Sequence, residues 1–206
     1  MKNYESKEKA IAYNASILKY FYTIMPLQYT EVTSHWHQHM ELILLTKGSL
    51  TIYLENSTIT AHAGDLVVFA PNQVHEWHGG PQTVEYHCIQ FNIERLLNQT
   101  PTSQKYLIPI IENEINYISP ISDLEINLHI EELIYYQNIN PNSLLTLSKV
   151  YFVLSLLNER CVKNSSNYVP DKKFAEILKY INIHFNEKIT TKSLSEKFAY
   201  NESYFC

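Results

Sequence analysis

The sequence lacks long apolar runs and has few cysteines and glycines. Its longest apolar stretches, such as residues 150–157, are too short to cross a bilayer, and the polar N-terminus has no apolar signal core. The 3 cysteines are scattered with no Cys-x-x-Cys pair, which favours a reducing cytoplasm over a disulfide framework. With 45% hydrophobic and 18% charged residues, the composition excludes a disordered chain. We therefore expect a soluble cytoplasmic protein with no membrane partner.

Basic residues are also scarce. The chain has 16 Lys and Arg against 21 Asp and Glu, a formal net charge of −5, which disfavours a DNA binder that uses its whole surface. Residues 171–206, however, hold six Lys and five acidic residues, which gives +1 there and −6 for residues 1–170. Any contact with nucleic acid is therefore expected in the C-terminal segment.

Residues 15 to about 93 have the pattern of β structure. Short alternating runs are separated by Glu-Asn and Ala-Gly-Asp breakers at hairpin spacing, and a longer run follows a Gly-Gly-Pro breaker. These runs span residues 50–54, 58–62, 66–70 and 83–93. Many short strands at even spacing are typical of a barrel or sandwich, so we expect a β-barrel over residues 1–100.

The periodicity becomes helical from Gln104. Candidate helices span residues 122–137 and 143–161, and residues 162–171 are polar, with Ser-Ser and Pro, as in an interdomain linker. In the second helix, five apolar residues fall on alternating steps of three and four and form a seam along one face, namely Leu147, Val150, Leu154, Leu157 and Cys161. Such a seam suits either a dimer-forming coiled pair or an ordinary core-facing helix. We expect residues 101–161 to form a helical dimerisation segment.

The C-terminal segment has the plan of a helix-turn-helix. Residues 174–185 place apolar side chains on one helical face, and Thr190 is a suitable N-cap for a short helix over residues 191–198. Residues 199–201 then form a tight turn, with Asn201 as the next N-cap. A helix, a short helix, a turn of about three residues and a further helix make the DNA-reading motif.

Residues 180–205, YINIHFNEKITTKSLSEKFAYNESYF, closely resemble the first helix-turn-helix of AraC/XylS-type transcription regulators, which carry two such units in tandem. The DNA contacts that the resemblance implies are Thr190, Thr191, Asn201, Glu202, Ser203 and Tyr204, the first two with phosphate. Ala199 stands where the family usually has glycine, and a left-handed turn there would cost about 1 kcal/mol. Because the chain ends at Cys206, inside the third helix, we expect weak DNA binding or none. The alternative is an amphipathic tail with no DNA role.

Histidines cluster in the β region. His35, His37, His39 and Glu41 have the same parity, so on one strand they would share a face. Four polar side chains on one face are costly to bury without partners. They therefore indicate a metal, a polar ligand or a wet cavity, and the turn that leads to His75 would lie close by in a barrel.

The spacing of His35, His37, Glu41 and Gly48, followed by Gly64 and His75, resembles the two motifs of the cupin superfamily. The resemblance implies that His35, His37, Glu41 and His75 bind a divalent transition metal such as Mn, Fe, Ni or Zn. Three departures from the motifs, at Tyr29, Asn72 and Gly79, put catalysis in doubt more than the fold. The sequence around these motifs resembles the sensor domains of AraC/XylS regulators even more closely. The resemblance implies a pocket that binds a small effector, often a sugar.

Three interpretations of this cluster remain open: a metal site, a polar effector pocket without metal that includes Trp77, and a structural hydrogen-bonded cluster. The expected fold is mixed β and α: a cupin-like β-barrel, a helical dimerisation segment, and the start of an all-α helix-turn-helix domain at residues 172–206. The expected function is a non-enzymatic, homodimeric transcription regulator that binds DNA and a small-molecule effector and requires no cofactor. The alternatives are a metal-dependent cupin enzyme and a ligand-binding module without DNA binding.

Overall fold

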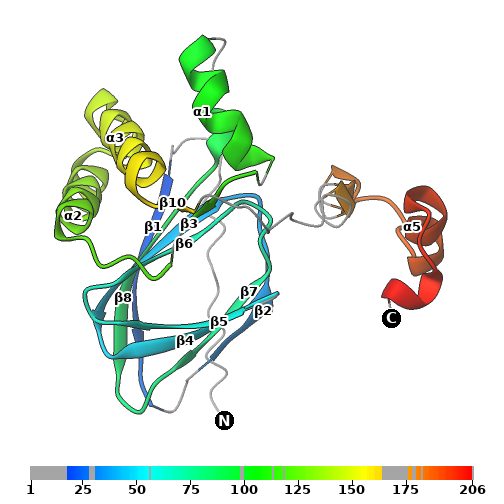
Figure 1. Cartoon of the computed structure of the whole chain (residues 1–206), viewed down its shortest axis with the longest axis horizontal. Helices are drawn as coiled ribbons and strands as arrows, with labels where there is room; N and C mark the ends of the chain where they lie inside the picture. Colours follow the sequence, from blue (N-terminus) through cyan, green and yellow to red (C-terminus); the bar gives the residue numbers. More distant parts are fainter. Residues whose placement is uncertain are drawn as a thin grey trace.

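The computed structural model describes residues 18–27, 31–55, 57–97, 100–112, 114–117, 119–163, 176–177, 180–181 and 183–205. Two four-stranded antiparallel sheets face each other in its N-terminal part (Figure 1). The strands are β1 (Leu18–Met25), β2 (Glu31–His35), β3 (Met40–Lys47), β4 (Ser49–Leu54), β5 (Ser57–His62), β6 (Leu66–Phe69), β7 (His75–Gly79) and β8 (Val84–Phe91). Their order is β1-β8-β3-β6 in the first sheet and β2-β7-β4-β5 in the second. The predicted N-terminal barrel is therefore confirmed as a two-sheet β-sandwich.

The strands follow the alternation in the sequence. The predicted runs 50–54, 58–62 and 66–70 correspond to β4, β5 and β6, each within about one residue. The turn between β3 and β4 requires Gly48, because its φ is +79° and an added Cβ would lie 2.8 Å from the carbonyl oxygen of Thr83. A larger residue at this turn would push the hairpin away from the strand that follows Thr83.

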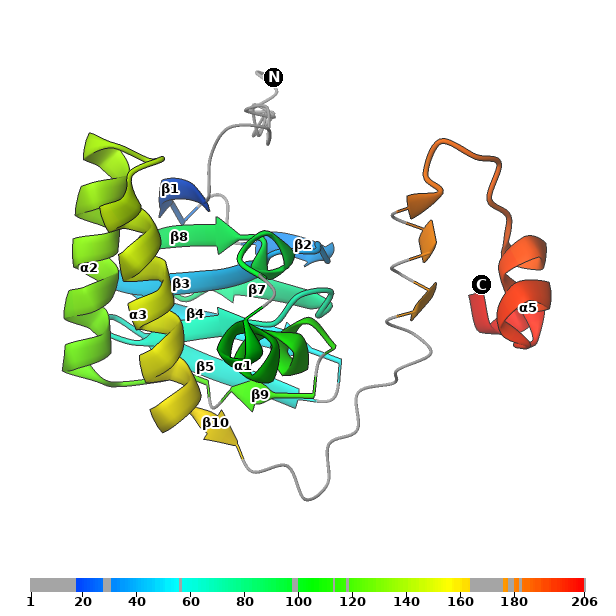
Figure 2. The ribbon, with the colours of Figure 1, turned by 90° about the horizontal axis from the view of Figure 1, so that it is seen from above.

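Two hydrophobic cores share the first sheet. Its inner face packs against the second sheet, and Ile43 and Leu45 of β3 belong to this inner core. Its outer face packs under the helices, and Met40, Leu42 and Leu44 of the same strand belong to that outer core. Side chains alternate along a strand, so β3 serves both cores. Figure 2 shows the helices lying over the sheet that contains this strand.

Three helices pack outside the sandwich: α1 (Pro101–Ile111), α2 (Leu124–Ile139) and α3 (Leu144–Arg160). The side chains of Asp123 and Ser143 accept hydrogen bonds from the first-turn amides of α2 and α3, and these N-caps fix where both helices begin. A short 3₁₀ turn, η1 (Ile93–Arg95), precedes α1, and a two-stranded ribbon pairs β9 (Asn116–Tyr117) with β10 (Val162–Lys163). The ribbon takes the first two residues of the predicted linker; residues 164–171 lie outside the described part.

The apolar seam predicted on α3 faces the chain's own core. Val150 and Leu157 are 0% exposed and Leu154 is 2% exposed, while Leu147 is half-buried against the same cluster. Between the two interpretations of the seam, the structure shows the core-facing helix. Any contact of α3 with a second copy must use other residues.

The C-terminal part contains α5 (Thr191–Phe198) and the 3₁₀ turn η2 (Glu202–Phe205). Thr190 and Ser193 form a reciprocal capping box at the start of α5. Ala199 ends the helix at φ 55° and ψ 45°, a left-handed conformation at the start of the tight turn expected over residues 199–201. The ring of Tyr180, from a segment with helical residues at 180, 181 and 183, lies 5.7 Å from the ring of Phe198. No helix in the described residues is both long and apolar enough to cross a bilayer.

Candidate functional site

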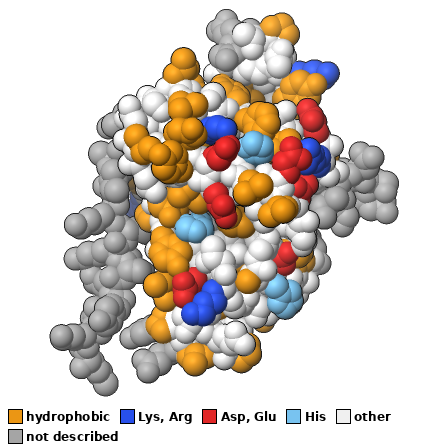
Figure 3. Space-filling view, turned by 90° about the vertical axis from the view of Figure 1, so that its left-hand side faces the viewer, with side chains coloured by type: hydrophobic (Ala, Val, Ile, Leu, Met, Phe, Trp, Pro, Cys, Tyr) orange, Lys and Arg blue, Asp and Glu red, His pale blue; other side chains and the backbone are white. Residues whose placement is uncertain are grey.

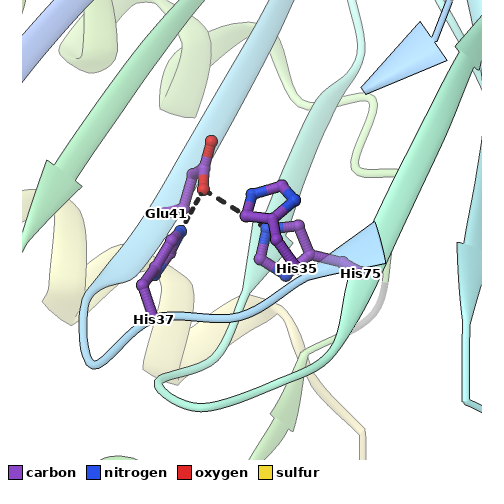
Figure 4. Close-up of side chains that lie close together, drawn as sticks. All are labelled: His35, His37, Glu41 and His75. Atoms are coloured by element: carbon purple, nitrogen blue, oxygen red, sulfur yellow. Dashed lines mark hydrogen bonds and ion pairs between the residues drawn. The ribbon is translucent and has the colours of Figure 1, made fainter. Parts of the chain in front are cut away.

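Four predicted residues lie together at one end of the sandwich (Figure 4). His35 is the last residue of β2, Glu41 lies on β3 and His75 begins β7, whereas His37 lies in the connection between β2 and β3. The expectation that His35, His37, His39 and Glu41 share one strand was therefore wrong, because β2 ends at His35 and β3 begins at Met40. The backbone amide of Asn72 donates to the carbonyl oxygen of His37 at 2.8 Å and holds the turn before β7 against this connection.

The hydrogen bonds of the three imidazoles assign their protons. Each Nδ1 faces a backbone carbonyl oxygen: His35 that of Thr33 at 2.9 Å, His37 that of His39 at 3.0 Å, and His75 that of Gln73 at 2.7 Å. A carbonyl oxygen only accepts, so each Nδ1 carries a hydrogen and donates it. In the neutral ring Nε2 is then a bare lone pair. In their neutral form, His37 and His75 thus turn an Nε2 acceptor toward Glu41.

Glu41 is the negative centre of the cluster. Its side chain is buried, and Oε2 lies 2.6 Å from Nε2 of His37 and 3.5 Å from Nε2 of His75. Burial opposes ionisation of Glu41. The hydrogen bonds and positive charge that His37 and His75 supply when their rings are protonated outweigh burial, and they hold the pKa of this carboxyl well below its usual range. The buried Nε2 of His75 has no hydrogen-bond partner among the described residues. A buried carboxylate among lone pairs calls for a positive charge, either a proton on a ring or a bound cation.

The donor set fits a divalent transition metal. One ligand atom from each of His35, His37, Glu41 and His75 lies within 4.8 Å of all the others. Two ligands on opposite sides of one ion, each about 2.2 Å from it, lie about 4.4 Å apart, so the four atoms need only small movements to share an ion. Metal-bound histidines characteristically donate their second ring nitrogen to a carbonyl or carboxylate, as all three do here.

Aromatic rings form one wall of the cluster. Phe69 stacks on the ring of His75 with centroids 4.2 Å apart, and Trp77 lies 5.7 Å from His75 and 5.6 Å from His35. Burial is the main cause that lowers the pKa of His35. Trp77 was predicted to bind ligand; it is 3% exposed and its Nε1 has no partner among the described residues. It therefore lies beside the cluster as a buried wall residue.

Sequence reasoning missed two residues of the site. Cys88 and Gln90 of β8 reach the carboxylate of Glu41: the Cys88 Sγ lies 3.0 Å from Oε1, and the Gln90 Nε2 lies 3.3 Å from Oε2. Their inward parity on a predicted strand was a signal, but the pairing of Glu41 with Gln90 needs the strand register. His39 takes part through its backbone oxygen, and burial lowers the pKa of its own ring to about 4.

The predicted DNA-contacting residues lie on the surface of the C-terminal part. Thr190, Thr191, Asn201, Glu202 and Ser203 are exposed, and the side chain of Tyr204 lies outside the described part. Several of these residues already make local hydrogen bonds. The Thr191 hydroxyl donates to Glu202 at 2.9 Å, and the Asn201 side chain accepts from the amide of Ser203 at 3.2 Å. These bonds order the turn, and DNA contact remains a prediction.

Comparison with known proteins gives one family match. Residues 26–112 match the model described as "AraC-like ligand binding domain", and no curated protein matches the chain. Among solved structures, a cupin-2 domain protein of Shewanella frigidimarina is similar at 18% identity and TM-score 0.33, over 36% of this chain and 71% of that chain. The cupin domain of Cnp3 from Schizosaccharomyces pombe gives 11% identity and TM-score 0.34, over 41% and 66%. A mutant oxalate decarboxylase of Bacillus subtilis gives 16% identity and TM-score 0.34, over 38% and 22%.

Proposed function

Since residues 26–112 form an AraC-like ligand-binding domain, we propose that the protein is the sensing part of an AraC/XylS-type transcription regulator. Its effector site is centred on His35, His37, Glu41 and His75, and these residues hold a divalent transition metal. The observation that carries the proposal is the grouping of one ligand atom from each of three histidines and a buried carboxylate within 4.8 Å of one another. Such domains are typical of regulators rather than enzymes, so we propose sensing as the role of the site.

The metal would supply a fixed positive charge to which oxygen donors of a small effector, such as a sugar or a carboxylate, can bind. His75 and Glu41 lie on core strands and are buried, whereas His35 and His37 lie at a strand end and in a connection and are partly exposed. An effector would therefore approach from the side of His35 and His37. Trp77 and Phe69 would exclude water from the far side.

Features of the C-terminal part support a DNA-binding role for the regulator. α5 has the capping box, the left-handed turn at Ala199 and the following turn of helix that a helix-turn-helix requires. Lys197 lies 4.4 Å from the centre of the Tyr180 ring, and this contact joins α5 to the preceding segment. We propose that effector binding changes how this unit is presented to DNA.

We further infer a homodimer built on the outward faces of α2 and α3. Apolar side chains gather on this side of the molecule (Figure 3). The exposed ones are Leu124, Leu128, Tyr135 and Ile139 on α2, and Leu144, Leu145 and Phe152 on α3. A gathering of exposed apolar side chains is typical of an interface, and paired subunits suit paired DNA half-sites.

The metal proposal is tested by titrating metal-free protein with Zn²⁺, Mn²⁺ and Ni²⁺ while following thermal unfolding. Binding to the native state at about 100 times Kd stabilises it by about 2.7 kcal/mol. We expect the rise in Tm to disappear in His37→Ala and Glu41→Gln. His78→Ala is a matched control, since His78 also contacts a carboxylate, that of Glu76 at 2.6 Å, outside the cluster. An equal rise in all of these variants would refute the site.

The DNA role is tested by selecting bound duplexes from a random pool at low salt. We expect weak enrichment of a sequence motif, lost when Ser203 is replaced by Ala. Tight, salt-resistant and sequence-specific binding by these 206 residues would contradict the expected weak binding. Equal enrichment by the wild type and the Ser203→Ala variant would contradict the proposal that Ser203 contacts DNA at the start of the recognition helix.

A further inference from the structure

The two carboxylate oxygens of Glu41 have different neighbours. Oε2 faces the imidazoles of His37 and His75. Oε1 accepts a hydrogen bond from the thiol of Cys88, with the sulfur 3.0 Å away. The thiol belongs to β8, and it is buried, at 6% exposed. A carboxylate that is held at one oxygen cannot rotate freely, so this contact determines which oxygen meets the histidines.

We propose that Cys88, assisted by Gln90, is a positioning residue that makes Glu41 a ligand through Oε2 alone. The inference rests on the proposed metal site. Cys88 would stay outside the coordination sphere and donate its S–H to the oxygen that does not bind metal. A second observation points independently to a bound cation here, since His75 is 1% exposed and its Nε2, aimed at the cluster, has no hydrogen-bond partner in the part of the chain that the structure describes.

The strand register explains why these two residues reach Glu41. Gln90 is the direct cross-strand partner of Glu41, and Cys88 pairs with Ile43, two residues along β3 on the same inward face. Direct and diagonal neighbours on one face of an antiparallel pair are within side-chain reach. The amide of Gln90 donates to Oε2 at 3.3 Å. Both oxygens of the buried carboxylate therefore have a donor from β8.

Residues that hydrogen-bond to a metal ligand and orient it contribute to metal affinity nearly as much as the ligand itself. Replacing such a partner typically weakens metal binding 10- to 100-fold. A thiol is a weak donor, and a hydroxyl is a stronger donor of similar size. Serine at position 88 should therefore preserve the function, and alanine should not. This pattern separates a hydrogen-bonding role from simple filling of space.

The experiment measures the affinity of the whole 206-residue protein for Zn²⁺ by calorimetry and records the absorption spectrum with Co²⁺. We expect Cys88→Ala to weaken Zn²⁺ binding about 10- to 100-fold, Cys88→Ser to bind within a few-fold of wild type, and Gln90→Leu to lie between them. Cys161→Ala is the matched control, since Cys161 is also a buried cysteine, at 4% exposed, but lies in the outer core. It should leave the affinity unchanged.

The outcomes are distinguishable. If wild type binds no metal, the proposed site fails, and this inference fails with it. If wild type binds and Cys88→Ala binds equally well, the site stands and the positioning role is wrong. A sulfur-to-cobalt charge-transfer band in wild type that is lost in Cys88→Ser would make Cys88 a direct ligand and overturn the proposal. Should Cys88→Ala fail to fold, Cys88→Ser and Gln90→Leu still decide it, because the proposal requires the first to retain affinity and the second to lose it.

Discussion

Ala199 holds a backbone conformation that costs free energy. Its φ of 55° lies in the left-handed region, which a residue with a Cβ enters at a cost of about 1 kcal/mol. We expect Ala199→Gly to stabilise α5 by about 0.5–1 kcal/mol, since glycine adopts this conformation without the steric penalty but loses more entropy on folding. Hydrogen exchange of the α5 amides measures the change.

The opposite substitution elsewhere provides the control. Gly64 has a φ of +94°, and an added Cβ would meet nothing within 4 Å. Gly64→Ala should therefore destabilise the protein by about 1 kcal/mol through backbone strain alone. If Ala199→Gly does not slow amide exchange in α5, or Gly64→Ala leaves the free energy of unfolding unchanged, then strain from the left-handed backbone does not determine stability at these turns.

His39 should make stability depend on pH. Burial lowers the pKa of its ring from 6.5 to about 4. Between these values the unfolded chain binds a proton that the folded chain does not, so stability falls as pH decreases through this window. The loss is about 2 kcal/mol after allowance for partial exposure of the ring. Urea unfolding in the presence of a chelator should show a flatter pH dependence for His39→Gln; an unchanged slope would assign the effect to other groups.

At the scale of elements, the two faces of α3 should respond differently to truncation. Leu157 is 0% exposed in the outer core, and Phe152 is 45% exposed. Leu157→Ala should cost about 2–5 kcal/mol in free energy of unfolding, whereas Phe152→Ala should cost less than about 1 kcal/mol. Denaturant unfolding measures both, and equal costs would mean that the faces are wrongly assigned.

The elements themselves were largely predictable from sequence. The expected helices at 122–137 and 143–161 correspond to α2 and α3 within about two residues, because capping residues and apolar periodicity agree there. The convergence of the site could not be predicted in the same way. Parity placed His35, His37 and Glu41 on one strand face, but the structure brings them together from a strand end, a connection and a core strand.

The sequence did not indicate which residues of neighbouring strands pair with each other. The contact of Cys88 and Gln90 with Glu41 follows from the register of β8 on β3, and nothing local to either strand specifies that register. The seam on α3 shows a similar limit. Its spacing suited both a coiled pair and a core helix, and only the packing of α3 in the outer core decides between them.

At the scale of the whole molecule, we expect self-association through the outward faces of α2 and α3. Replacing Leu128 and Tyr135 together by Glu would place charges on this apolar face and should shift the protein from twice 24.1 kDa to 24.1 kDa in sedimentation equilibrium. Tyr53→Glu, on the exposed outer face of β4, is the control and should leave the mass unchanged. A wild-type mass of 24.1 kDa at all concentrations would contradict the proposed homodimer.

The sharing of β3 between the two cores has a consequence for how this part of the chain unfolds. Met40, Leu42 and Leu44 anchor the helices, while Ile43 and Leu45 anchor the second sheet. Neither core can open without loosening the same strand, so the sandwich and its helices should melt in one cooperative transition. The slowest-exchanging amides should then include those of β3, and a metal bound at Glu41 should protect amides in α3 as strongly as those in β7.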